Sequence, residues 1–319
     1  MSADLVLVCP GCRTASPGRI DVRTLERTGD VLACECGRRY PIVDGVPVVF
    51  ADPEVAPLVE GELPPEVAAL LALPGPDDAP YPRLLEHLSI YLDAHWGDVA
   101  EPPPEPAFGL APIAERIAAR AAAPVDLAVE LGASVGRLVA ELARGARRIA
   151  AVELQLGAIR RARRLLAGEA LPYARRIAGR HYLPAAIRAQ AIASQLLLVC
   201  GDALDPPLLP NLFERVVAVN LLDSVARPRQ LLSVLDGLCA PGGEIILASP
   251  YAWQSGVVHE DERIGGADPA ADVAAILRDG TGLGARYHLE DEADLVWTLR
   301  RDARSTATYR THYLRARKL

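Results

Sequence analysis

Residues 127–153 constrain the fold of this chain more than any other stretch. They begin with an apolar run, 127–129, of the kind that forms a buried parallel strand. Small residues at 132–136 end that run, and apolar residues at three- and four-residue spacing up to Ala146 then predict a helix. A second apolar run follows and ends in the acid Glu153. Strand, small-residue turn, helix, strand and acid is the order of a nucleotide-binding βαβ unit, so we expect an α/β fold.

The turn in this unit points away from dinucleotides and toward S-adenosylmethionine. Glu130 stands at the end of the first strand, where it would repel a pyrophosphate but not a sulfonium amino acid. The turn also lacks the third glycine of the G-x-G-x-x-G pattern. The segment ELGASVGR resembles the first motif of class I methyltransferases, D/E-x-G-x-G-x-G, with Ser134 in place of the middle glycine. The resemblance implies S-adenosylmethionine as cofactor and S-adenosylhomocysteine as product. An ordinary βα turn without ligand is the alternative.

Acids and small residues at strand ends supply the other expected cofactor contacts. Glu153 lies about 20 residues beyond the turn, where an acid can bind ribose hydroxyls. A third apolar run ends in Gly-Asp-Ala at 201–203, and in the fold that the motif implies Asp202 accepts from the adenine amino group. The expected cofactor-binding residues are Glu130, Gly132, Ala133, Ser134, Gly136, Glu153, Leu154, Asp202, Ala203 and Asn220.

The candidate catalytic residues follow the fourth and fifth expected strands. Asn220 ends one apolar run and Asp223 comes directly after it, while Tyr251 and Trp253 follow the next run in the segment SPYAW. Open α/β sheets bind ligands beyond the carboxyl ends of their strands. We therefore expect Asn220, Asp223 and Tyr251 to orient a methyl acceptor and Trp253 to form a wall of the site. Core packing is the alternative for both aromatic residues.

The rest of the C-terminal part matches the strand order of the same fold. A Pro-Gly-Gly turn at 241–243 precedes the fifth strand, and the chain ends in two apolar stretches joined by a short polar turn. We expect a Rossmann-like, seven-stranded class I methyltransferase sheet over residues 123–319. The expected strands after the first two are 196–203, 213–223, 244–248, 294–301 and 307–317.

The first 52 residues carry two close cysteine pairs, Cys9/Cys12 and Cys34/Cys36. Four thiolates on two turns can close a tetrahedral structural zinc site, which would hold so small a unit together. The pattern CPGC, CEC and YPIVDGVPV resembles the small Trm112-like zinc-ribbon family, with C-x-C in place of the second C-x-x-C. The resemblance implies a β zinc-ribbon domain over 1–52 that binds structural Zn²⁺. A metal-free β-module with unused cysteines is the alternative.

Residues 53–122 have the composition of a proline-rich linker followed by a helical lid. A helix is expected at 83–98, where His95 and Trp96 either touch a ligand or pack at the helix end. A connection at 168–195 is unusually long for this position. It either caps the site or makes a surface excursion, and its candidates are Tyr173, Arg175, Arg176, Arg180, His181 and Tyr182.

A narrower resemblance concerns the substrate. SPYAW, the sequence RIGG at 263–266, the inserted segment and the final hairpin are similar to the C-terminal module of ovothiol-synthesis enzymes, the mercaptohistidine N-methyltransferases. Arg263 and Ile264 stand where that group has Trp and Leu. The resemblance implies methyl transfer to a nitrogen of a small imidazole- or histidine-like acceptor, or of a related amino-acid derivative.

The net charge of -7 argues against a general nucleic-acid surface, and no stretch has the form of a signal peptide or membrane span. We expect a cytoplasmic enzyme with a small-molecule acceptor, no membrane or nucleic-acid partner, and a protein partner or homodimer contact through the zinc module. Two other functions stay open: an rRNA or tRNA base methyltransferase, and a catalytically silent scaffold that recruits a partner.

Overall fold

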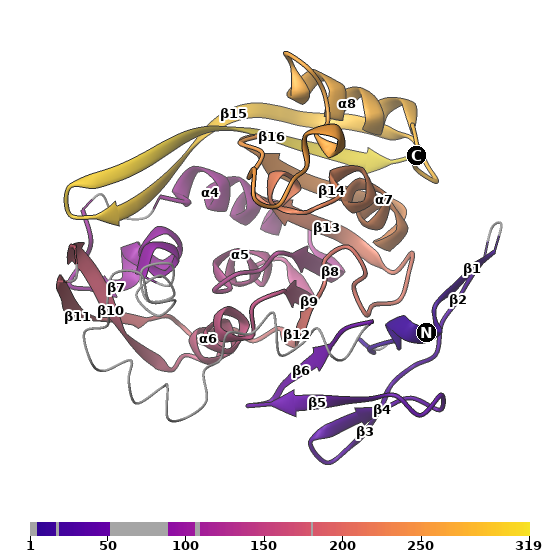
Figure 1. Cartoon of the computed structure of the whole chain (residues 1–319), viewed down its shortest axis with the longest axis horizontal. Helices are drawn as coiled ribbons and strands as arrows, with labels where there is room; N and C mark the ends of the chain where they lie inside the picture. Colours follow the sequence, from indigo (N-terminus) through magenta and orange to yellow (C-terminus); the bar gives the residue numbers. More distant parts are fainter. Residues whose placement is uncertain (1–4, 17–18, 52–88, 106–108, 180) are drawn as a thin grey trace.

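The computed structural model describes residues 5–16, 19–51, 89–105, 109–179 and 181–319 (Figure 1). Its centre is a parallel sheet of five strands, to which a long antiparallel hairpin is added at one edge. The order β15-β16-β14-β13-β8-β9-β12 is that of seven strands drawn from the C-terminal part, so the predicted Rossmann-like α/β fold is confirmed. The seven strands are β8 (Val125–Leu131), β9 (Ala146–Glu153), β12 (Gln195–Gly201), β13 (Phe213–Val219), β14 (Cys239–Ser249), β15 (Tyr287–Asp302) and β16 (Ser305–Lys318).

Helices cover both faces of this sheet, which is why its central strands are apolar without alternation. On one face α4 (Ala111–Ala119), α5 (Arg137–Leu142) and α6 (Leu156–Leu166) pack into the core. On the other face lie α7 (Pro228–Leu238) and α8 (Pro269–Asp279), as Figure 1 shows. The carboxyl ends of the five parallel strands remain open between these layers.

Two local predictions need correction. The helix predicted to extend to Ala146 ends at Leu142, and Ala146 is already the first residue of β9. The Pro-Gly-Gly segment lies inside β14, where the register with β13 shifts between Phe213 and Arg215. Gly242 has a positive φ of 74°, so an irregularity inside the continuous strand β14 stands in place of the predicted turn.

The N-terminal module, residues 5–51, is joined to the same sheet. Its strand β6 (Val46–Val49) pairs in parallel with β12, with Cys200 opposite Val48, so the sheet has eleven strands in all. The Asp-Gly turn before β6 closes a hairpin as predicted. The other strands of the module are β1 (Thr14–Ser16), β2 (Arg19–Asp21), β3 (Glu26–Thr28), β4 (Val31–Ala33) and β5 (Arg39–Val43). The sequence did not predict this continuous sheet.

The long connection at 168–195 is a hairpin of β10 (Ala170–Ala178) and β11 (His181–Arg188), extended by the short β7 (Ala100–Glu101). Its Arg175 is buried and donates to Asp93 over 2.9 Å, and Arg300 of β15 donates to the other oxygen of that carboxylate over 3.2 Å. Asp93 lies in a helix whose described part is 89–96. The insertion therefore anchors that helix to the C-terminal hairpin.

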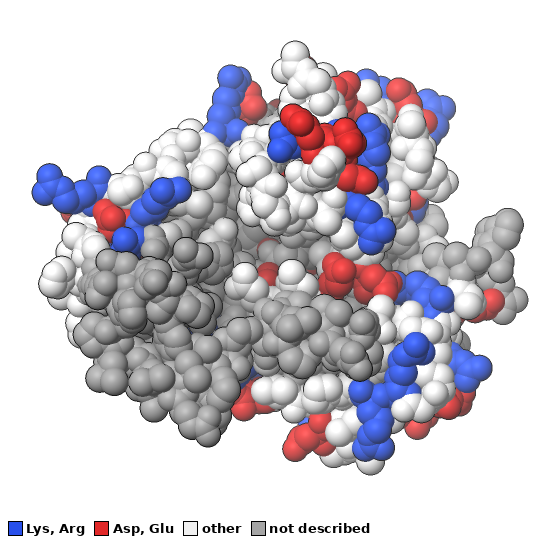
Figure 2. Space-filling model, viewed as in Figure 1, with Lys and Arg blue, Asp and Glu red and all other residues white. Residues whose placement is uncertain are grey.

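Short 3-10 helices complete the described elements: η1 (Pro10–Cys12), η2 (Gly97–Val99), η3 (Arg120–Ala122), η4 (Leu222–Ser224) and η5 (Glu260–Glu262). The linker predicted to begin at residue 53 lies outside the described residues as far as residue 88. Within the described part, no helix has the length and apolar character needed to cross a membrane. The face shown in Figure 2 carries acidic and basic side chains interspersed.

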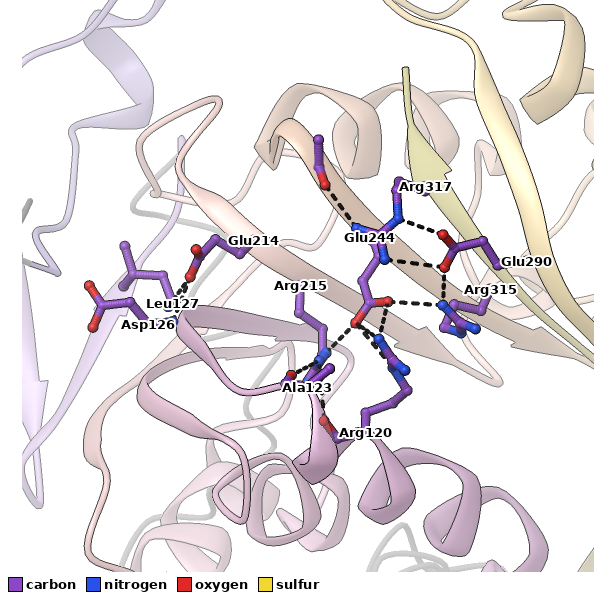
Figure 3. Close-up of polar contacts among 11 residues, drawn as sticks. Arg120, Ala123, Asp126, Leu127, Glu214, Arg215, Glu244, Glu290, Arg315 and Arg317 are labelled. Atoms are coloured by element: carbon purple, nitrogen blue, oxygen red, sulfur yellow. Dashed lines mark hydrogen bonds and ion pairs between the residues drawn. The ribbon is translucent and has the colours of Figure 1, made fainter.

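The amino ends of the parallel strands are held by a cluster of buried charges (Figure 3). Glu244 of β14 accepts from Arg215 of β13 over 2.6 Å, from Arg120 of η3 over 3.1 Å and from Arg315 of β16 over 3.4 Å. Burial alone would raise the pKa of Glu244, but the guanidinium groups of Arg215 and Arg120 outweigh that effect and lower it. The charges at the amino ends of the strands are thus paired with one another, in contrast to those at the carboxyl ends.

Candidate functional site

A cavity of about 440 Å³ opens at the carboxyl ends of the strands, a size typical of small-molecule sites. The ends of β8, β9 and β13 form its floor, and the helix at 89–96 together with the C-terminal hairpin forms its other wall. Of the expected site residues, those that line the cavity are Glu130, Gly132, Ser134, Glu153, Leu154, Asn220 and Asp223. These expected residues therefore lie together at one cavity at the carboxyl ends of the strands.

The turn after β8 has the conformation that its small residues allow. Gly132 and Gly136 have φ values of 77° and 82°, and a Cβ at Gly132 would lie 3.0 Å from the side chain of Leu221. Ser134 also has a positive φ, 49°, and so adopts the left-handed backbone that the motif's glycine would adopt. Its amide donates to Glu153 over 2.8 Å. The replacement of the middle glycine therefore leaves the turn intact.

The carboxylates of Glu130 and Glu153 lie close enough to repel each other, and no Lys or Arg is among the described residues that line the cavity. Glu130 is 2% exposed, and its Oε2 atom has no hydrogen-bond partner. Burial and the neighbouring charge of Glu153 raise the pKa of Glu130 well above its usual value. Burial also raises the pKa of Glu153, although the amides of Gln155 and Ser134 donate to it. This pair suits a ligand that brings an ammonium group and hydroxyls.

Asn220 and Asp223 lie beyond β13 at the same cavity. Asn220 has a positive φ of 52°, and its Oδ1 atom is buried without a partner. Asp223 accepts from the amide of Ala252 over 2.8 Å through Oδ2, while its Oδ1 has no partner. Burial raises the pKa of Asp223. Buried polar atoms without partners destabilise the free protein, and a ligand that supplies hydrogen-bond partners removes this cost.

The structure places Tyr251 and Trp253 at a neighbouring cavity of about 540 Å³ or beside it, not on the cavity of Asn220. Tyr251 contacts His312 Nδ1 over 2.8 Å, and His312 Nε2 contacts Glu292 over 2.9 Å. Because a carboxylate only accepts, Nε2 of a neutral His312 carries the proton and Nδ1 accepts from the Tyr251 hydroxyl. Trp253 packs against the Tyr251 ring with 5.9 Å between centroids.

The other expected cofactor residues do not line the cavity. Ala133 and Gly136 belong to the turn: the amide of Gly136 donates to Ala133 over 2.9 Å, and the amide of Ala133 donates to Val152 over 3.1 Å. Asp202 accepts from the amide of Leu204 over 2.8 Å, which closes the loop after β12, and Ala203 is buried beside it. The turn, Glu130 and Glu153 thus line one cavity with Asn220 and Asp223, whereas Asp202 and Ala203 follow the neighbouring strand β12, in which Cys200 lies opposite Glu153.

Four aromatic residues line the cavity opposite these acids: Tyr91 and His95 of the helix at 89–96, Trp297 of β15 and Tyr309 of β16. His95 is buried, and its ring lies 5.8 Å from that of Tyr91 and 6.0 Å from that of Trp297. Burial, and then the charge of Arg137, lower the pKa of His95 to about 3, so the imidazole is neutral at physiological pH. Sequence reasoning considered His95 but missed the three others. Trp297 and Tyr309 are cross-strand partners, a signal visible only once the hairpin register is known.

The four cysteines of the N-terminal module form a separate cluster whose sulfur atoms all lie within 4.8 Å of one another. The Cys9–Cys36 and Cys12–Cys34 sulfur distances are 3.9 and 3.7 Å. Tetrahedral zinc with Zn–S bonds of about 2.3 Å requires sulfur atoms about 3.8 Å apart. The cluster therefore has the spacing of a four-thiolate metal site.

Comparison with known proteins identifies the sheet domain. Residues 129–247 match the family model described as a methyltransferase domain. This part of the chain therefore matches a methyltransferase domain. The match begins in β8 and ends in β14, so it contains the turn, the three cavity carboxylates and Asn220. No curated protein matches the chain.

Solved structures of methyltransferases are similar in fold to this chain at low identity. The N-methyltransferase NodS from Bradyrhizobium japonicum WM9 is 13% identical with a TM-score of 0.43, over 66% of this chain and 96% of that one. The magnesium protoporphyrin IX methyltransferase ChlM from Synechocystis PCC 6803 with bound SAM is 15% identical with a TM-score of 0.42, over 66% and 80%. A complex of the Haloferax volcanii Trm112 methyltransferase activator with a methyltransferase is 15% identical with a TM-score of 0.42, over 66% of this chain and 92% of that one.

Proposed function

We propose that the chain transfers a methyl group from S-adenosylmethionine to a nitrogen of a small imidazole- or histidine-like acceptor, or of a related amino-acid derivative. The observation that carries the proposal is the set of buried, unpartnered oxygen atoms of Glu130, Asn220 and Asp223 around one cavity of the methyltransferase domain. A cationic methyl donor and a polar acceptor supply the partners that these atoms lack.

The residues at the β8 and β9 ends fit the donor. The Glu130 carboxylate would accept from the methionine ammonium group, and Glu153 would accept from the ribose hydroxyls. Gly132 and Ser134 keep the backbone low enough for the ligand to approach. When bound, the cofactor supplies a methyl group activated by its sulfonium charge.

The residues beyond β13 fit the acceptor. The amide of Asn220 and the carboxylate of Asp223 would hold a nitrogen in line with the sulfur–methyl bond. Such positioning contributes about 7–11 kcal/mol to the barrier reduction in well-oriented reactions. The nitrogen lone pair forms the new bond, and the electrons of the broken bond stay on sulfur. Positive charge thus passes from donor to acceptor, where Asp223 stabilises it.

Titration of the purified chain with S-adenosylhomocysteine by isothermal calorimetry tests the donor site. We expect one saturable site per chain, weakened at least about tenfold by Glu153→Gln, since that change removes a charged hydrogen-bond acceptor. Glu260→Gln, in the exposed η5 turn, is the matched control and should bind as the wild type does. Absence of binding at millimolar ligand would refute the proposal.

We also propose that residues 1–52 are a Trm112-like zinc-ribbon domain, that 53–122 are linker and lid, and that Cys9, Cys12, Cys34 and Cys36 bind structural Zn²⁺. The sulfur spacing supports this assignment. Elemental analysis should give one zinc per chain, and Cys12→Ser should lower that content. A fully metal-free protein with unchanged thermal stability after chelation would contradict it.

The N-terminal module is also the proposed contact for a protein partner or a second copy. Its strand β3 ends the eleven-strand sheet, and all three of its residues are exposed. An open sheet edge of this kind can pair with another chain. Sedimentation across a hundredfold concentration range tests self-association; a strictly monomeric mass would leave only a different partner.

A further inference from the structure

One part of the cavity lining is the aromatic box, which we define as Tyr91, His95, Trp297 and Tyr309. The rings come from two elements far apart in sequence, the helix at 89–96 and the C-terminal hairpin. His95 stands in edge contact with Trp297, at an interplanar angle of 81°. Its buried Nδ1 atom has no hydrogen-bond partner. The box therefore offers flat apolar faces and one unused polar atom.

The charged side chains that line the cavity beside this box are all acidic, and the nearby Arg137, which donates to the His95 carbonyl oxygen over 3.2 Å, is paired with Asp98 and Glu141. Glu130, Glu153 and Asp223 line the cavity, and among its described lining residues there is neither Lys nor Arg. Glu153 and Asp223 are close enough to Tyr91 to raise its pKa, after the larger effect of burial. The imidazole of His95 is neutral and so does not offset these acids. The acidic side chains therefore favour a cation over an anion beside the aromatic box.

We infer that the methyl acceptor is an amine or nitrogen heterocycle that carries neither carboxylate nor phosphate, and that it lies within the aromatic box. The inference rests on the proposed function and narrows its substrate class from histidine-like compounds to their carboxylate-free relatives. A buried carboxylate would meet three acids and no Lys or Arg among the described residues that line the cavity, since Arg137 lies behind His95 and is paired with Asp98 and Glu141, so its desolvation cost would be large. An amine nitrogen attacks as the free base and leaves as a cation, which aromatic faces and carboxylates stabilise.

Pairs of probes that differ only in a carboxylate test this directly. Histamine and L-histidine share a ring and an amino group, and tyramine and L-tyrosine form a second such pair. Binding of each probe to the complex with S-adenosylhomocysteine is measured by calorimetry. We expect the decarboxylated member of a pair to bind at least about tenfold more tightly, as a single unpaired buried charge readily causes. Imidazole-4-acetate should not bind.

Two variants connect the preference to the charges. Asp223→Asn should reduce the ratio between histamine and L-histidine affinities, and Leu299→Lys, which places a cation on the cavity wall, should reverse it. Asp294→Asn is the matched control, because Asp294 lines the neighbouring cavity, and it should leave the ratio unchanged.

The outcomes separate this inference from the proposed function. If S-adenosylhomocysteine does not bind, both fall. If it binds but the amino acid of each pair binds more tightly, or if no amine of either pair binds to the complex, the inference is wrong and the methyltransferase proposal stands.

Discussion

Glu130→Gln should stabilise the free protein while removing most of its cofactor affinity. Glu130 is 2% exposed and has one oxygen without a partner, and Glu153 adds repulsion. An unsatisfied buried polar group costs about 1–3 kcal/mol, and more when it is charged. Loss of that charge should therefore raise the free energy of unfolding by about 1–3 kcal/mol. At about 2–4 °C per kcal/mol for domains of 150–250 residues, Tm should rise by several degrees.

Glu244→Gln is the control, because Glu244 is equally buried but its environment is opposite. Three guanidinium groups surround its carboxylate (Figure 3). Removal of one partner from such a buried pair costs about 3–5 kcal/mol, since the other charges are left uncompensated. The same change of Glu to Gln should thus lower the Tm of the protein at position 244 and raise it at position 130.

The pH dependence follows from the direction of the Glu130 shift. Its pKa is raised in the folded state, so between the unfolded and folded pKa values the native protein binds more protons than the unfolded chain. Stability of the free protein therefore falls as pH rises through this window. Glu130→Gln should flatten that fall. Affinity for a cationic donor should rise with pH over the same window, because the ionised carboxylate is the form that binds an ammonium group.

Thermal unfolding with and without S-adenosylmethionine, measured from pH 5 to pH 8, follows both effects. The reasoning fails if Glu130→Gln lowers Tm as Glu244→Gln does, or if the ligand raises Tm equally in wild type and variant. A stabilised variant that no longer responds to ligand is the expected result.

Three further outcomes are expected. Asp93→Asn should lower the free energy of unfolding in urea by about 3–5 kcal/mol, because it leaves the buried guanidinium groups of Arg175 and Arg300 uncompensated. A loss below about 1 kcal/mol would contradict the role of Asp93 in anchoring its helix to the insertion and the C-terminal hairpin. Ser134→Gly should change stability by less than about 0.5 kcal/mol, whereas Ser134→Val should cost about 1–2 kcal/mol and weaken S-adenosylhomocysteine binding, since a β-branched residue resists the left-handed backbone; equal melting curves would refute this. Tyr251→Phe should leave S-adenosylhomocysteine affinity within about twofold of wild type, since Tyr251 does not line the cofactor cavity, while Asn220→Ala should weaken it at least about threefold; calorimetry that shows the reverse order would move the site.

The part of the site that sequence could predict is the part set by local pattern. Apolar runs with an acid at their ends fixed Glu130 and Glu153 on neighbouring strands, because parallel strands end at one edge of the sheet. The aromatic box depends instead on contacts between residues about 200 positions apart, as between His95 and Trp297. Neither residue lies in a motif, and β-hairpin register decides which faces of Trp297 and Tyr309 turn inward.

The pairing of the N-terminal module with the main sheet could not be predicted from local sequence either, because it also depends on contacts between distant residues. The sequence predicts the hairpin that contains β6, because Asp-Gly favours that turn. Nothing in the strand itself indicates that its free edge pairs with β12. Tyr251 is a related case. Its position after β14 is evident from sequence, but its contact with His312 of β16 and its place at the neighbouring cavity depend on the pairing of β14 with β16.

Backbone strain and charge repulsion occur together at the carboxyl edge, and this association supports a ligand site there. Among the described residues, six that are not glycine have positive φ, and four of these, Ser134, Asn220, Tyr251 and Trp253, follow strands at their carboxyl ends. Such conformations cost about 1–3 kcal/mol each and persist only where surrounding structure imposes them. The amino edge, by contrast, pairs its buried acid with arginines. A fold that satisfies one edge and leaves the other strained and acidic holds free energy that a cationic ligand can recover, and the opposite responses of Glu130 and Glu244 to the same substitution measure that difference.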